Sequence, residues 1–194
     1  MSETGDELNP NGMDPIGPSR GDQEQGRLNT WLQRGNERQF REQMTAGTRL
    51  LQERKPQEAL PFLKRAYEIR SADADAALNL ASAYILMGRY KLAVPVLEAA
   101  LQHAPTNARL WINLGAAYLG NPVLASDEQQ LKAIGAFQRA LQHDPFAPSA
   151  AYNIGLIHVD RGEVDKAIAA FRLAARCDPG DLDAKRLLMK LENR

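Results

Sequence analysis

The stretch AIGAFQRALQHDP, residues 133–145, decides the fold because close variants of it occur at three other places in the chain. The variants are EALPFLKRAYEI at 58–69, LAVPVLEAALQHAP at 92–105 and AIAAFRLAARCDP at 167–179. Their first matching alanines are Ala59, Ala93, Ala133 and Ala167, at intervals of 34, 40 and 34 residues. Self-similarity at a nearly fixed period indicates a tandem array of structural units.

A second series of small residues lies upstream of the first. It recurs as TAG, LNLASAY, INLGAAY and YNIGLIH, with Gly47, Ala81, Gly115 and Gly155 spaced by 34, 34 and 40 residues. The two series agree except for six residues inserted between the halves of the third unit, around GNPVLAS at 120–126. Each unit therefore has two halves, and the third unit carries an insertion between them.

Each half has the pattern of an amphipathic helix. Leu80, Tyr84 and Met87 follow the i, i+4, i+7 spacing that places side chains on one helix face. Glycines in MGRY and RGEV suit the left-handed end of a helix between the halves. Ser126 followed by Gln129 predicts a capping box at the start of the helix after the insertion.

The third unit resembles the tetratricopeptide repeat in its pattern of large and small residues, namely Trp111, Leu114, Gly115, Tyr118, Ala133, Phe137, Ala140 and Pro145. The other units resemble it less fully, and the first is degenerate. The resemblance implies an all-α fold, a right-handed α-solenoid of four helix-turn-helix repeats with a C-terminal capping helix. The repeats are expected at 40–73, 74–107, 108–147 and 148–181, and the capping helix at 182–194.

Residues 1–39 differ from the rest of the chain because they hold many glycines and prolines and few apolar side chains. Such a stretch buries too little surface to offset its ordering entropy. We therefore expect a largely disordered tail over 1–39, with disorder strongest over 1–26. Trp31 is expected either in a short helix that docks on the first repeat or in a mobile linker.

Composition argues against several classes of function. Lys plus Arg and Asp plus Glu both number 24, so the charge balance predicts no nucleic-acid partner. No apolar run reaches the roughly 18–20 residues of a membrane span, and the start of the chain lacks the pattern of a secretory signal. Cys177 is the only cysteine. These features predict a cytoplasmic protein.

Enzymatic motifs are absent from the sequence. His103 and His143 occupy the same repeat position one repeat apart, which is a poor arrangement for joint metal ligation. His158 stands where an inward-facing aromatic is expected, which favours a satisfied core or boundary histidine over a catalytic one. We find no phosphate-binding glycine loop, HExxH or GxSxG motif. The sequence therefore predicts a protein that is not an enzyme and has no cofactor, no metal site and no catalytic residues.

The candidate binding residues lie on the first helix of each repeat. Asn79, Asn113 and Asn153 recur at one repeat position, although asparagine is a mediocre helix former. The resemblance implies that this position faces the concave surface, where an amide can bind the backbone of an extended peptide. The alternative is that the asparagines hold neighbouring helices together.

The same face carries apolar side chains and one arginine: Leu78, Ile112, Tyr152, Leu156 and Arg109. Either these apolar side chains pack against adjacent helices or they line a groove that buries a partner peptide. A carboxylate clamp of the kind found in chaperone-binding members of the family is disfavoured, because Met44 and Thr48 stand where lysine and asparagine are expected.

The sequence thus predicts a non-catalytic adaptor that binds an extended or helical segment of a protein partner in the concave groove. The alternative is a permanent subunit or assembly factor of a larger complex, which would use the convex face or the 120–126 insertion. No motif specifies the partner or the oligomeric state.

Overall fold

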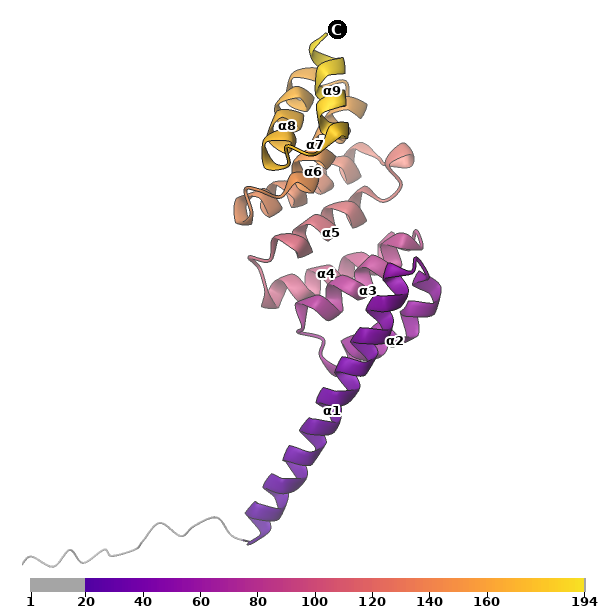
Figure 1. Cartoon of the computed structure of the whole chain (residues 1–194), viewed down its shortest axis with the longest axis vertical. Helices are drawn as coiled ribbons and strands as arrows, with labels where there is room; N and C mark the ends of the chain where they lie inside the picture. Colours follow the sequence, from indigo (N-terminus) through magenta and orange to yellow (C-terminus); the bar gives the residue numbers. More distant parts are fainter. Residues whose placement is uncertain (1–19, 194) are drawn as a thin grey trace, which may run out of the picture. The chain divides into compact units, whose positions relative to one another are not determined.

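The computed structural model describes residues 20–193, and the chain divides into two units, Met1–Arg38 and Gln39–Arg194. Every regular element in residues 20–193 is helical (Figure 1). The elements are α1 (Arg20–Gln52), α2 (Pro56–Ile69), α3 (Ala74–Leu86), α4 (Tyr90–His103), α5 (Ala108–Leu119), the 3₁₀ turn η1 (Pro122–Leu124), α6 (Asp127–His143), α7 (Pro148–Asp160), α8 (Val164–Cys177) and α9 (Leu182–Glu192). Over this described range no helix combines the length and the apolar character that a membrane span requires.

Helix α1 begins earlier than the sequence pattern predicts, because residues 20–39 of the expected tail are helical. The segment is rich in arginine, glutamine and glutamate, which are good helix formers. They outweigh Gly26 and Gly35, each of which costs roughly 1 kcal/mol relative to alanine. Trp31 therefore lies in a helix and not in a linker, and its side chain is 70% exposed. The predicted disorder of residues 1–19 lies outside the described residues.

The second unit is built from helical hairpins that follow one another along the chain (Figure 1). From α2 to α9 each helix contacts its neighbours in sequence, and α3 also contacts α5, the first helix of the next hairpin. Because each hairpin touches only adjacent ones, the unit is a stack and not a single central core. The predicted fold class, an all-α array of repeats ending in a capping helix, is confirmed.

The repeated small and large residues form the interior of this stack. The alanines at the first repeat position are fully buried, and so are the larger side chains four residues later: Ala59, Ala93, Ala133 and Ala167, with Leu63, Leu97, Phe137 and Phe171. At the end of the stack α9 buries Ala184 and Leu191 against the last hairpin. The apolar face of each hairpin is thus covered by the next element.

The insertion takes a defined conformation between α5 and α6. Gly120, with φ of 64°, ends α5 in a backbone region that favours glycine. Asn121 then caps η1, and Ser126 begins α6. The predicted capping box is confirmed, since the Ser126 hydroxyl accepts from the Gln129 amide at 3.3 Å and the Gln129 side chain accepts from the Ser126 amide at 2.9 Å.

Candidate partner-binding surface

The three asparagines lie on one face of the first helices α3, α5 and α7. This asparagine face comprises the predicted residues and their neighbours at equivalent repeat positions: Asp75, Asn79, Ser82, Arg109, Asn113, Ala116, Ser149, Asn153 and Leu156. The helical hairpins place these side chains in register, because the same repeat positions recur every 34 residues, or every 40 across the insertion.

Two of the asparagines bridge adjacent first helices. The Asn79 amide donates to the Thr48 hydroxyl at 3.1 Å, and the Ser82 hydroxyl donates to the Asn113 carbonyl oxygen at 3.4 Å. Both bonds join residues 31 positions apart, so they are equivalent rungs in successive repeats. Asn113 also donates to the Arg109 carbonyl at 3.0 Å. Asn79 and Asn113 thus help to hold the first helices together.

The third rung is missing. Ala116 stands where Thr48 and Ser82 supply hydroxyls, so the equivalent partner for Asn153 is absent. The Asn153 amide turns back to the Ser149 carbonyl at 2.7 Å. Among the described residues the Asn153 side-chain oxygen has no hydrogen-bond donor, and the side chain is partly exposed. Asn153 therefore retains the side-chain acceptor that Asn113 uses within the repeat stack.

The apolar residues predicted for the groove separate into three cases. Leu78 is only 3% exposed and belongs to the core cluster of α2 to α5, so its assignment as a surface contact is corrected. Ile112 and Tyr152 are half-buried, each packed against a core cluster. Leu156 is 39% exposed. Leu78 is covered because the side chains of its core cluster surround it.

Tyr152 shows how the last hairpin is closed. Its ring meets that of Phe171 edge to face, with centroids 5.7 Å apart and planes at 65°. Burial raises the pKa of the Tyr152 hydroxyl, and the carboxylates of Asp183 and Asp181 at the start of α9 add to the shift. The side chain is therefore engaged with α8 and α9 over much of its surface.

Arg109 forms an ion pair with Asp75, one repeat earlier, at 3.2 Å. The two side chains are 70% and 68% exposed, so the pair adds little to stability and the arginine remains within reach of a partner carboxylate.

The insertion contributes to this surface, which the sequence pattern does not predict. A hollow of about 170 Å³ lies between η1 and α7. Its lining includes Pro122 and Val123 from the insertion with Asn153 and Leu156 from the asparagine face. Val123 is 89% exposed. The only signal in the sequence is the presence of apolar residues in a polar, glycine-flanked loop.

A polar network fastens the first turn of α6, which follows the insertion, to the end of α7. Arg161, at the end of α7, donates to Asp127 and to Gln130 at 3.1 Å each, while the Gln130 amide donates to Asp160 at 2.5 Å. Gln130 is 4% exposed, so its side-chain amide is satisfied in a buried position.

The network continues through Glu163. Its carboxylate accepts from Lys166 at 3.0 Å and from Arg161 at 3.1 Å, and lies 2.7 Å from the His158 ring nitrogen. The hydrogen bonds from Lys166 and Arg161 lower the pKa of Glu163 to about 2. The expectation that His158 is a satisfied boundary histidine is met by this geometry.

The comparison with known families decides the identity of the repeats. Tetratricopeptide repeat families match residues 50–93, 74–117 and 131–181. The chain belongs to the tetratricopeptide repeat family. The tetratricopeptide fold of this chain is that of a scaffold for protein–protein interaction.

Two curated proteins contain segments similar to this chain. Protein O-mannosyl-transferase Tmtc3 of Drosophila melanogaster is 29% identical over 124 residues, and protein FlbA of Caulobacter vibrioides is 32% identical over 125 residues. Each match covers 64% of this chain, but only 13% of Tmtc3 and 20% of FlbA. The similarity therefore concerns a small part of each relative.

Solved tetratricopeptide structures resemble the chain over most of its length. MamA from Desulfovibrio magneticus RS-1 has a TM-score of 0.63 at 26% identity, covering 74% of this chain and 77% of that one. YrrB, described as a TPR protein with an unusual peptide-binding site, has a TM-score of 0.56 at 26% identity, covering 73% and 70%.

Proposed function

We propose that this chain is a non-catalytic scaffold that binds an extended segment of a protein partner along the asparagine face, with its main contacts at α5, α7 and the insertion. The missing third rung is the observation that carries the proposal. Asn153 keeps an acceptor that no described residue uses, and a peptide N–H is the complementary donor. The site thus lies toward the C-terminal part of the array.

The surroundings of Asn153 supply apolar contacts for such a segment. Leu156 and Val123 are exposed on either side of the 170 Å³ hollow, and Pro122 adds to its wall. A partner side chain of aliphatic character would bury these atoms, while its backbone would meet Asn153. When an extended segment binds in this way, hydrogen bonds to its main chain give the affinity, and the hollow gives the specificity for its side chain.

Ile112, Tyr152 and Arg109 complete the proposed site at its edges. The exposed part of the Arg109 guanidinium offers a bidentate donor to a carboxylate of the partner, in competition with Asp75. Asn79 and Asn113 serve chiefly as rungs between helices in this proposal. The unusual peptide-binding site described for YrrB lends support to peptide recognition by a similar stack.

Two changes test the site, one that adds an internal partner for Asn153 and one that removes the asparagines. Ala116→Ser gives Asn153 an internal hydroxyl and should weaken partner binding without loss of stability. Asn113→Ala combined with Asn153→Ala should weaken binding as well. Ala99→Ser, on the exposed outer surface of α4, is the matched control. The partner is first captured from the native host with the full chain, identified by mass spectrometry and purified, and its affinity for each variant is then measured.

The proposed site is wrong if the purified partner binds the Asn113→Ala, Asn153→Ala double variant and wild type with equal affinity. A partner that stays bound through high salt, with affinity unchanged by every variant on the asparagine face, would favour the alternative of a permanent subunit that uses another surface.

A further inference from the structure

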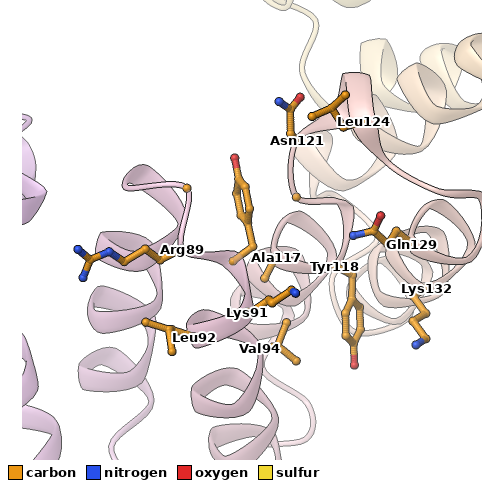
Figure 2. A pocket seen from close by; sticks show the side chains of 13 residues that line it. Arg89, Lys91, Leu92, Val94, Ala117, Tyr118, Asn121, Leu124, Gln129 and Lys132 are labelled. Atoms are coloured by element: carbon orange, nitrogen blue, oxygen red, sulfur yellow. The ribbon is translucent and has the colours of Figure 1, made fainter.

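A larger hollow, distinct from the asparagine face, lies where the α3–α4 turn approaches the insertion (Figure 2). Its volume is about 600 Å³, within the range of sites that hold a ligand or several peptide side chains. We call it the basic cleft. The residues that matter are Arg89, Tyr90 and Lys91 at the start of α4, Tyr118 at the end of α5, Leu124 in the insertion and Lys132 on α6.

The charged lining of the basic cleft is entirely cationic. Arg89, Lys91 and Lys132 line it, and no aspartate or glutamate does. Lys132 pairs with Glu128 at 2.8 Å, but among the described residues neither Arg89 nor Lys91 has an acidic partner, and both are exposed. In a chain whose net charge is zero, this local excess of positive charge attracts an anionic group.

The remaining lining is apolar and aromatic. Leu124 is 78% exposed and Leu92 is 48% exposed, whereas Ala117 at the base is almost fully buried. The Tyr118 hydroxyl donates to Glu98 at 2.6 Å, which turns its polar end toward an acid outside the lining. Figure 2 shows Arg89 and Lys132 at opposite sides, with Lys91 between them and Leu124 above.

The walls of the basic cleft are held by defined contacts. A Cβ atom at Gly120 would lie 3.5 Å from the Tyr90 ring, so the ring packs directly against the end of α5. The capping box at Ser126 holds the start of α6, and Arg161 fastens that turn to α7. A site built on such elements requires little reordering when a partner binds.

We propose that the basic cleft is a second docking surface, which binds a segment of a protein partner that carries one large apolar side chain flanked by acidic residues. The apolar side chain enters between Leu92 and Leu124, and the acids meet Arg89 and Lys91. Charge complementarity gives the orientation of the segment and speeds its association, while burial of apolar area supplies the affinity. This surface is separate from the asparagine face and does not depend on the function proposed for it.

The test uses three fluorescein-labelled peptides and fluorescence anisotropy with the full chain. The first peptide is Glu-Glu-Ser-Phe-Glu-Glu, the second replaces Phe by Ser, and the third replaces the four glutamates by lysine. Only the first should bind saturably, and its affinity should fall as salt screens the charges. Arg89→Glu combined with Lys91→Glu should weaken binding by about tenfold or more, and Leu124→Ser by about threefold or more.

The matched control is Lys64→Glu combined with Arg65→Glu, which makes the same charge change on exposed positions of α2. It should leave the affinity of the first peptide within about twofold of wild type. Acidic residues at the start of a helix are favourable, so the reversal at Arg89 and Lys91 is not expected to unfold α4. Circular dichroism and the urea midpoint verify that each variant is folded.

Three outcomes would overturn the proposal. The first peptide does not bind saturably, or the α2 control weakens binding as much as the cleft variant does, or the Ser-Ser peptide binds as tightly as the first. Sedimentation velocity adds a fourth. If the chain is a dimer that dissociates on Arg89→Glu and Lys91→Glu, a second copy occupies the basic cleft and the proposal of a separate partner is wrong.

Discussion

Replacement of Gly115 by alanine tests how closely the two helices of the third hairpin approach. A Cβ at Gly115 would lie 2.7, 2.8 and 2.9 Å from three atoms of the Phe137 ring. Ordinary contact begins near 3.4 Å, so the ring would have to move by about 0.7 Å. Phe137 is fully buried, so its ring can move only if its neighbours also shift. Overpacking of this kind costs about 1–3 kcal/mol.

The cost is partly hidden, because alanine is the better helix former by about 1 kcal/mol. Gly135→Ala is the matched control, since it lies in the same hairpin and a Cβ there meets nothing within 4 Å. We expect Gly135→Ala to raise the free energy of unfolding by up to about 1 kcal/mol. Gly115→Ala should lower it by up to about 2 kcal/mol, the overpacking cost less this gain.

Urea unfolding followed by circular dichroism measures both variants, and the difference between them isolates the steric cost. Phe137→Leu in the Gly115→Ala background should recover part of the loss, because the smaller side chain relieves the contact. If Gly115→Ala stabilises the protein as much as Gly135→Ala does, the close approach inferred for α5 and α6 is wrong.

Three further predictions concern polar contacts. Ser126→Ala removes the capping box of α6 and should lower the free energy of unfolding by about 1 kcal/mol. Ser71→Ala, which removes a serine outside any cap, should change it little. Equal losses of the two variants in urea unfolding would contradict the capping role. Asn79→Ala removes the bond to Thr48 and should lower the free energy of unfolding by about 0.5–1.5 kcal/mol. The same substitution in a Thr48→Val background should lower it by less. An equal loss in both backgrounds would show that the bond contributes nothing. The pKa of Glu163 is lowered from 4.5 to about 2 by Lys166, Arg161 and His158, so the stability that its charge provides is complete above pH 4.5 and is lost as the pH falls toward 2. The difference in urea midpoint between wild type and Glu163→Gln should follow that window, and a difference that does not change with pH would refute the assignment.

The helical hairpins could be predicted from the sequence because their signal is repeated. Similar residues surround the alanines at the first repeat position, which are Ala59, Ala93, Ala133 and Ala167. The period therefore relates positions that are far apart in the chain. The capping box at Ser126 was equally predictable, since its two residues lie within one turn of helix. Local and periodic patterns therefore determine most of the second unit.

The start of α1 and the role of the insertion could not be predicted in the same way. Residues 20–39 hold few apolar side chains, so their helix depends mainly on propensity, which is a weak guide. The hollow between Val123 and Leu156 and the network around Arg161 join residues more than 30 positions apart. They depend on where the insertion folds, and a sequence without a repeat at that point does not specify this.

The sequence left open whether Leu78 packs against adjacent helices or lines the groove, and in the structure it is buried among the helices. The helical wheel assigns Leu78, Ile112 and Tyr152 to one repeat position, but their exposure differs with place in the array. Leu78 on α3 is buried, whereas Ile112 on α5 and Tyr152 on α7 are half-buried. The helices that surround a residue therefore matter as much as its position within the repeat.

The bonds from Arg161 to Asp127 and Gln130 make the last hairpin a support for the first turn of α6, which directly follows the insertion and belongs to the preceding repeat. Local unfolding of α7 and α8 would remove these bonds and release the first turn of α6, and with it Val123 and Leu124. A ligand that binds the folded insertion therefore also stabilises the final hairpin against local unfolding. Amide protons in α7 and α8 should therefore exchange more slowly when a ligand occupies the insertion, at a distance from the ligand itself.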